Sequence, residues 1–333
     1  MDFYPIPPYR FPEIFFSDGP GTFRALGPMT EPIMRSPVSI VIPTFGRLEV
    51  LWNTLGYLAA QIRENDEILL IDQNSPPLAI PQNLLNLPIQ CLALPKPSLT
   101  KARNFGLIKA RHDWIIFLDD DIIPDPDLIH SMVFIAQKNP GCIATGRIEQ
   151  ADQNPNLRGV GFIDLRSGEI RTDYHQPIRG EIPFFPGGLF ILRKSDLPRG
   201  MGFCPSFRGA SQGEEIDFAL RAKKIGMRII SDPDIFMTHL KSATGGCRSE
   251  EFRSRFFRDE LHNRALFYGR HGQWFYALSF LKRTKDFMEF HTRKPGKGHS
   301  WILMGAASRS VLMGGVMGIL LRLQDYFKGA VYR

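Results

Sequence analysis

Short apolar runs and helical patterns alternate along the middle of the chain. Val38 to Ile42, Glu67 to Ile71 and Trp114 to Leu118 have the continuous apolar character of strands covered on both faces of a sheet. Ile89 to Leu94 is a weaker run of the same kind. From Leu48 to Ile62, apolar residues recur every three or four positions, which predicts a helix with one apolar stripe. This alternation with short links predicts an α/β fold with a mostly parallel sheet flanked by helices.

Polar residues follow these strands at the point where each one ends. Thr44 comes after the first strand, Asp72 after the second, and Asp119 to Asp121 directly after the strand at Trp114. In parallel sheets, ligands bind in the crevice at the carboxyl ends of the strands. Carboxylates at the tip of a buried strand need a cation nearby, and their oxygens suit Mg2+ or Mn2+, which in turn bind diphosphates. The pattern favours a metal site at this edge of the sheet.

Each of these polar residues also has a purely structural explanation. Asp125 to Asp127 supply the capping residues of a helix that is predicted to run to about Lys138, so the preceding acids could belong to a surface turn. Asp72 could close a turn with the polar residues that follow it. Arg103, on the helix before the acidic strand, could be solvated or form one half of a surface ion pair.

Composition sets only broad limits on the class of protein. The 333 residues, 43% of them hydrophobic, are enough for one large domain with extensions. The net charge of +7 suggests anionic partners such as phosphates or lipid head groups, and nothing in the sequence supports nucleic-acid binding. The four cysteines show no CxxC pair and no zinc spacing, which suits free thiols in a reducing compartment. Because the N-terminus lacks the pattern of a secretory signal, we expect a cytoplasmic protein.

The two ends of the chain differ from its middle. Residues 1–36 are rich in proline, glycine and aromatic residues, which predicts an extended lead-in. Residues 273–333 form a basic and apolar tail. Within it, the apolar stretch 301–321 could span a bilayer, but Arg309, two serines and four glycines interrupt it. A helix that lies on an anionic membrane surface is the favoured prediction, and a helix packed on the main domain is the close alternative.

Two further groups of residues lie in the second half of the chain. Gly187 and Gly188 precede a short apolar strand, where they would let the backbone approach a ligand closely, although an ordinary turn also explains them. Glu214, Glu215 and Asp217 open a predicted helix. Acids are favoured at that end by the helix dipole whatever their function, so position alone does not select a catalytic residue among them.

Taken together, several stretches resemble the family 2 glycosyltransferases of the GT-A fold. The stretches are SIVIPTFGR (39–47), LLIDQNS (69–75), ARNFGL (102–107) and WIIFLDDDIIPDPDLI (114–129). One departure is Gly46, where asparagine is common in the family. The resemblance extends over residues 37–272, and it implies a nucleotide-binding half (37–130) followed by an acceptor and catalytic half (131–272).

The resemblance also implies roles for individual residues. It predicts that Asp119, Asp121 and His239 hold Mn2+ or Mg2+, although a lone histidine such as His239 is usually structural. Residues predicted to bind the nucleotide-sugar are Pro43, Thr44, Arg47, Asp72, Arg103, Asn104, Asp119 and Asp120.

The catalytic base is also predicted from the resemblance. GEEIDFALRAKKIG (213–226) is similar to the acidic motif of the family, in which the second acid is the base. That acid is Glu215, a glutamate where aspartate is commoner. Glu214 and Asp217 are the remaining candidates and, with the glycine pair at 187 and 188, form the expected acceptor side.

The predicted activity is therefore that of an inverting, metal-dependent glycosyltransferase. It would move a sugar from a nucleotide-diphospho-sugar to a glycan or lipid-linked acceptor, in polysaccharide or glycolipid biosynthesis at the cytoplasmic face of the cell envelope. A sugar-1-phosphate nucleotidyltransferase fits less well, because it needs a glycine-rich basic loop where this chain reads PTFGRLEV (43–50). A dinucleotide oxidoreductase would need GxGxxG there. A non-catalytic nucleotide-sugar-binding or scaffold protein of the same fold remains an alternative.

Overall fold

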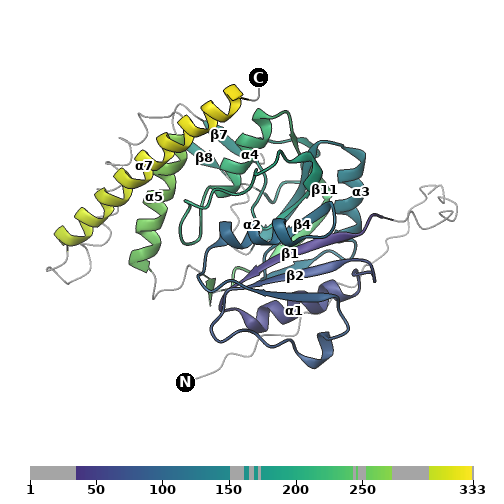
Figure 1. Cartoon of the computed structure of the whole chain (residues 1–333). Helices are drawn as coiled ribbons and strands as arrows, with labels where there is room; N and C mark the ends of the chain where they lie inside the picture. Colours follow the sequence, from purple (N-terminus) through teal and green to yellow (C-terminus); the bar gives the residue numbers. More distant parts are fainter. Residues whose placement is uncertain are drawn as a thin grey trace, which may run out of the picture. The chain divides into compact units, whose positions relative to one another are not determined.

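The structure is a computed structural model that describes residues 35–150, 161–164, 169–171, 174–242, 245–246, 253–271 and 300–331 (Figure 1). Nearly all of the predicted lead-in lies outside the described residues, as does the first part of the basic tail.

The first half of the sheet is parallel, as the sequence predicted. Its strands pair in the order β3-β2-β1-β4, each parallel to its neighbour. Their bounds, close to the predicted ones, are β1 (Val38–Thr44), β2 (Glu67–Asp72), β3 (Ile89–Ala93) and β4 (Trp114–Leu118). Helix α1 (Leu48–Ala59) follows β1, and helix α2 (Leu99–Lys109) leads into β4. The predicted α/β class is confirmed in these elements.

The second half of the sheet adds antiparallel pairs. β10 (Leu189–Arg193) lies between β4 and β6 (Cys142–Gln150) and is antiparallel to both. β11 (Arg228–His239) runs parallel to β6, with a register shift between Ser231 and Phe236. The short strands are β5 (Ile122–Pro124), β7 (Phe162–Asp164), β8 (Glu169–Arg171) and β9 (Gly180–Glu181). The sheet is therefore mixed, with its parallel character concentrated on the N-terminal side.

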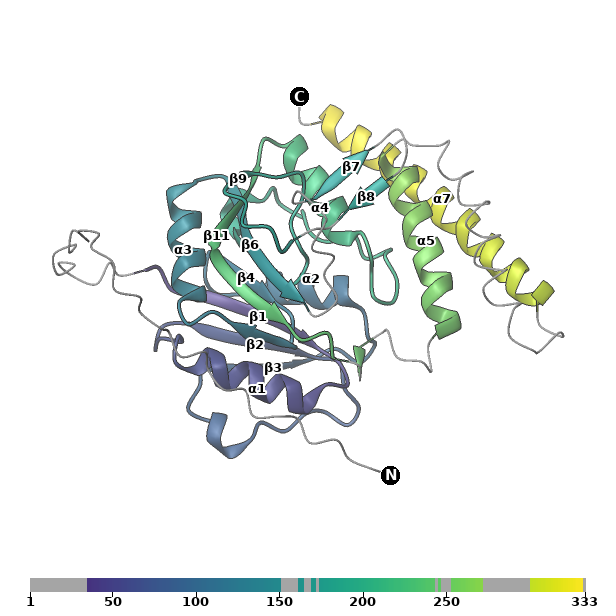
Figure 2. The ribbon, with the colours of Figure 1, turned by 180° about the vertical axis from the view of Figure 1, so that it is seen from behind.

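Helices cover both faces of this sheet (Figure 2). On one face, leucines of α1 and the apolar side of α3 (Leu128–Lys138) pack on β1, β2 and β4. On the other face, α2 and α4 (Glu214–Lys224) enclose an aromatic cluster. In this cluster the rings of Phe117 and Phe190 stack at 4.6 Å, and those of Phe203 and Phe218 at 4.5 Å. The buried strands explain the continuous apolar runs in the sequence, because side chains on both faces are covered.

Two long helices end the described chain. α5 (Arg253–His271) and α7 (Ser300–Val331) pack side by side. Glycines allow the close approach: a β-carbon on Gly318 would lie 2.3 Å from the carbonyl oxygen of Leu266. The tail therefore packs on a neighbouring helix. Across the part of the chain that the structure describes, no helix combines the length and apolar character needed to cross a membrane.

Candidate active site

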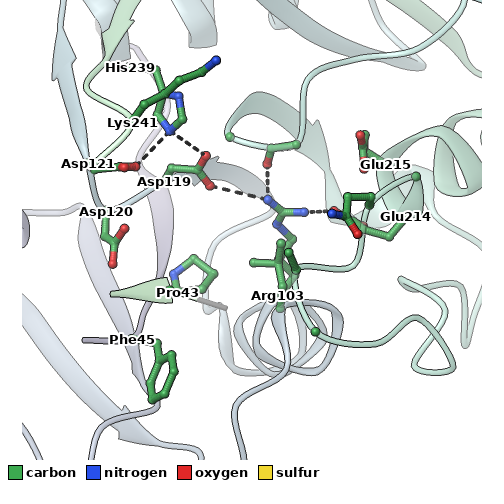
Figure 3. A pocket seen from close by; sticks show the side chains of 18 of the residues that line it. Pro43, Phe45, Arg103, Asp119, Asp120, Asp121, Glu214, Glu215, His239 and Lys241 are labelled. Carbon is green, nitrogen blue, oxygen red and sulfur yellow. Dashed lines mark hydrogen bonds and ion pairs between the residues drawn. The ribbon is translucent and has the colours of Figure 1, made fainter. Parts of the chain in front are cut away.

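A cavity of about 980 Å3 lies at the carboxyl ends of β1 and β4 (Figure 3). Eleven of the residues selected from the sequence line it, namely Pro43, Arg47, Arg103, Asp119, Asp120, Asp121, Gly187, Gly188, Glu214, Glu215 and His239. Strand ends, the turn before β10, the start of α4 and the end of β11 thus meet around one space. This is the edge of the sheet at which the sequence predicted a ligand.

On one wall, two carboxylates and an imidazole come together. One ligand atom each from Asp119, Asp121 and His239 lies within 4.8 Å of the others. His239 Nε2 is 3.0 Å from Asp121 Oδ1 and 3.7 Å from Asp119 Oδ2. The pairing of β11 with β5 explains this proximity, because its register sets His239 opposite Ile122, the residue after Asp121.

Arg47 and Thr44 hold the inner acids of this wall. The Arg47 guanidinium donates to Asp121 Oδ2 at 2.9 Å and to Asp120 Oδ1 at 3.2 Å, and the Thr44 hydroxyl donates to Asp120 Oδ2 at 2.7 Å. Burial raises the pKa of Asp120 to about 6, against the opposing effects of Arg47 and Thr44. Burial also acts to raise the pKa of Asp121, but His239 and Arg47 outweigh it and lower that pKa. Asp121 is thereby kept ionised, while Asp120 points away from Asp119 and His239 (Figure 3).

The glycine pair before β10 makes room for the outer acid. A β-carbon on Gly188 would lie 2.2 Å from Asp119 Oδ2, so any side chain at this position would displace the carboxylate. The Gly188 carbonyl also accepts a hydrogen bond from the Asp119 amide at 3.3 Å. The sequence predicted that the backbone here approaches a ligand, and in the structure Gly188 closely approaches Asp119. The Asp119 side chain is about one-third exposed.

Arg103 connects the two sides of the cavity. Its guanidinium is buried, donates to the Gly187 carbonyl at 2.5 Å, lies 3.6 Å from Asp119 and forms an ion pair with Glu214 (Figure 3). Burial lowers the pKa of Arg103, and the charges of Asp119 and Glu215 oppose that shift. Arg103 is therefore an internal cation of the site, whereas the sequence also allowed a solvated side chain.

The three acids of α4 have different surroundings. Glu214 is buried in its ion pair with Arg103. Asp217 is fully buried away from the cavity, and burial acts to raise its pKa, but the nearby cations, among them Arg270, lower that pKa to about 2. Glu215 is partly exposed and lines the cavity (Figure 3). Glu214 and Glu215 both line the cavity, and Glu215 is the more exposed of the two.

Four of the residues selected from the sequence do not line the cavity. Thr44 supports Asp120, and Asp217 belongs to the buried ion cluster just described. Asp72 accepts hydrogen bonds from the backbone amides of Asn74 and Leu78 at 2.9 Å, which is the turn-closing role left open by the sequence. Asn104 is bonded through its side chain to both the amide and the carbonyl of Phe203 at 2.7 Å. Each of these four polar groups is engaged by the protein, and their contact with a ligand stays a prediction.

Several lining residues were not selected from the sequence. Lys241 follows the end of β11 and adopts a left-handed backbone with φ of 49°, and the amide of Ser242 donates to Asp121 Oδ2 at 3.0 Å. Proximity to His239 in the sequence was the signal that could have identified these two. Arg264, Phe267 and Tyr268 reach the cavity from α5. No sequence signal identified these three residues, because the sequence did not show that α5 returns to the site.

Comparisons with known proteins concern the family and the fold. A family model described as glycosyl transferase family 2 matches residues 39–200. Two curated proteins of Haemophilus influenzae, both described as uncharacterized glycosyltransferases, are 24% identical over 104 residues and 34% identical over 105 residues. These matches cover 31% and 30% of this chain, and only 35% and 39% of the two relatives.

A solved structure supports the fold. The crystal structure of GalNAc-T7 with UDP, GalNAc and Mn2+ superposes with a TM-score of 0.53 at 15% identity, over 72% of this chain and 51% of that one. At this level of identity the similarity concerns the fold alone.

Proposed function

Since the chain belongs to the glycosyl transferase family 2 through residues 39–200 and has the predicted GT-A fold, we propose that it is an inverting, metal-dependent glycosyltransferase. It would transfer a sugar from a nucleotide-diphospho-sugar to an acceptor hydroxyl. The observation that carries the proposal is the single cavity with the Asp119, Asp121 and His239 cluster on one wall and the Glu215 carboxylate on another.

The residues of the cluster fit a divalent cation. Two carboxylates and one imidazole are a donor set that suits Mn2+ or Mg2+, and the lowered pKa of Asp121 keeps that acid in its ligating form. Asp119, Asp121 and His239 would hold the metal, which when bound neutralises charge on the diphosphate leaving group. GalNAc-T7 is described with Mn2+, a point of support from a protein of the same fold.

Glu215 is proposed as the general base. The acceptor oxygen attacks the anomeric carbon from the face opposite the diphosphate, the bond to the phosphate oxygen breaks, and the acceptor proton passes to the Glu215 carboxylate. Glu214 is unsuited to this step because Arg103 pairs with it in a buried position. The partial exposure of Glu215 leaves its carboxylate accessible from the cavity.

The nature of the substrates is part of the proposal. The acceptor is a glycan or a lipid-linked glycan, used in polysaccharide or glycolipid biosynthesis at the cytoplasmic face of the membrane. Residues 37–130 would contact the nucleotide and residues 131–272 the acceptor, and Arg47 and Lys241 are suitably placed cations for a diphosphate.

A thermal-shift screen tests the proposal without knowledge of the acceptor. The purified chain is heated with UDP-, GDP-, dTDP- and CMP-sugars, each with Mn2+ and with EDTA. One class of donor should raise the melting temperature only with metal, since a ligand at a hundred times its Kd adds about 2.7 kcal/mol of stability. An Asp121→Ala variant should lose that shift. A shift that is unchanged by EDTA and by Asp121→Ala would contradict the proposed metal site.

A further inference from the structure

Helix α7 exposes a row of large apolar side chains. Among the described residues, thirteen large hydrophobic side chains are exposed, and six of these lie within twelve positions of α7. They are Leu312, Met313, Val316, Met317, Leu320 and Leu323, here called the α7 stripe. Their spacing places them along one side of the helix over about 16 Å. Leu312 is 66% exposed and Leu320 55%, so these are not the edges of buried side chains.

The opposite side of α7 is fixed to α5. Gly314 and Gly318 are buried there, and a β-carbon on either would lie 2.3 Å from a carbonyl oxygen of α5. Farther along, Arg270 of α5 donates to both carboxylate oxygens of Asp325 at 2.8 to 3.1 Å. Figures 1 and 2 show α7 outermost, with α5 on its inner side. The stripe therefore faces outward because the other side of the helix is occupied.

The charges around the stripe are positive. Arg309 and Arg322 are exposed near its two ends. The only acid in the sequence of α7 is Asp325, which Arg270 holds. The segment 281–299, which leads into α7, contains six lysines and arginines and two acids. Exposed cations of α7 therefore lie near both ends of the stripe, and the sequence that precedes α7 is also basic.

We propose that the α7 stripe docks on an anionic membrane surface, with the stripe at the acyl boundary and the flanking cations among the head groups. Apolar faces flanked by lysine and arginine bind anionic lipid in this way, through buried area and electrostatic attraction together. A second copy of the chain is a poorer occupant, because it would bring its own Arg309 and Arg322 against the same cations of the first copy. The docking surface does not depend on the proposed transfer reaction.

Docking through this face has a consequence for the cavity. α5 packs on the inner side of α7 and contributes Arg264, Phe267 and Tyr268 to the cavity wall. That wall would lie one helix away from the membrane surface. If the proposed glycosyltransferase function holds, this placement favours an acceptor that is carried on a lipid.

Vesicle co-sedimentation of the full chain tests the docking surface directly. Vesicles of equal parts phosphatidylglycerol and phosphatidylcholine are compared with vesicles of phosphatidylcholine alone. The parental chain should bind the anionic vesicles, and raising the salt from about 0.1 M to about 1 M should weaken that binding because the Debye length shortens from about 10 Å to about 3 Å. The double variant Val316→Asp/Leu320→Asp should reduce the partition coefficient at least about tenfold.

The matched control is Leu85→Asp/Ile108→Asp. Leu85 and Ile108 are 53% and 71% exposed and lie outside α7, so this variant adds the same two negative charges away from the stripe. It should keep most of the vesicle binding, and circular dichroism should show both variants folded. The proposal is overturned if the stripe variant binds like the parental chain, or if both double variants lose binding equally. It is also overturned if the parental chain ignores the vesicles and sediments in solution as a dimer that the stripe variant dissociates.

Discussion

The chain contains two groups of acids that look alike in the sequence and differ in the structure. Asp119 to Asp121 follow β4, and Glu214, Glu215 and Asp217 open α4. Within each group, protein cations hold the buried members, and one of the acids that line the cavity is more exposed than the others. That acid is Asp119 in the first group and Glu215 in the second.

The two groups differ in the elements that supply their partners. The partners of the first group include Thr44, at the end of β1, and Arg47, just after it. His239, at the end of β11, is a further partner. Asp217 depends on Arg270 and His271 of α5, more than fifty residues later, and Arg270 is in turn held by α7. In the second group, Asp217 is buried among several cations, whereas Glu215 is partly exposed and lines the cavity. The following substitutions test this distinction.

Replacing Asp217 should have the largest effect on stability. In Asp217→Asn, Arg221, Arg270 and His271 lose their shared anion in a buried position. Breaking a buried ion cluster from one side typically costs about 3–5 kcal/mol, which urea unfolding would measure. The matched control is Asp234→Asn, since Asp234 is 64% exposed in its pair with Arg179 and should cost no more than about 1 kcal/mol. If both variants lost the same free energy of unfolding, the buried Asp217 would stabilise the fold no more than the exposed Asp234.

Acid should gradually remove part of the stability that Asp217 contributes. The pKa of Asp217 is lowered from 3.8 to about 2, so the folded state binds this proton less readily than the unfolded state. The resulting stability, about 2 kcal/mol, is fully present above about pH 4 and is lost as the pH falls toward 2. The difference in unfolding free energy between the parental chain and Asp217→Asn should therefore narrow over that range. If the difference in unfolding free energy between the two proteins stayed constant over this range, the pKa of Asp217 would not be lowered by its cations.

Removing the α7 end of this cluster should matter less. Asp325 is 43% exposed, so Asp325→Asn leaves Arg270 with Asp217 and with solvent nearby. We expect a loss of about 1 kcal/mol in the free energy of unfolding. A loss as large as that of Asp217→Asn would show that α7 is an integral part of the cluster that supports α4.

Asp119 should be nearly neutral for stability and essential for ligand binding. Its side chain is about one-third exposed and lies 3.6 Å or more from Arg103 and His239, so Asp119→Asn should change the unfolding free energy by no more than about 0.5 kcal/mol. The same variant should lose the metal-dependent thermal shift given by the nucleotide-sugar. If Asp119→Asn were strongly destabilised, or if it kept the full thermal shift, Asp119 would support the fold rather than bind the ligand.

The sequence predicted the parts of the fold that depend on local pattern. The apolar runs located β1, β2 and β4, and the acids at the end of β4 indicated the edge that carries the cavity. Helix α3 begins at Leu128, with Asp127 at the N-cap position, two residues after the predicted N-cap Asp125, whose carboxylate accepts from the Asp127 amide.

Other features depend on contacts between distant segments. The length of β11 could not be read from a segment interrupted by Pro233, because its pairing with β6 and β5 extends it to His239. The antiparallel β10 brings Gly188 against Asp119, and nothing near Gly188 in the sequence specifies that neighbour. The same limit applies to the burial of Asp217, which is set by cations on a helix whose return to the site has no local signal.

The most direct test of the proposed chemistry is the rate at which Glu215→Gln hydrolyses the donor found in the thermal-shift screen, with water as the acceptor of the sugar and nucleoside diphosphate as the released product. General base catalysis contributes about 100-fold to 10,000-fold, so kcat should fall by that factor while the donor still stabilises the folded variant. Glu49→Gln, at an exposed position of α1 outside the cavity, should keep the parental rate. A folded, donor-binding Glu215→Gln variant that turns over at the parental rate would contradict the assignment of Glu215 as the base.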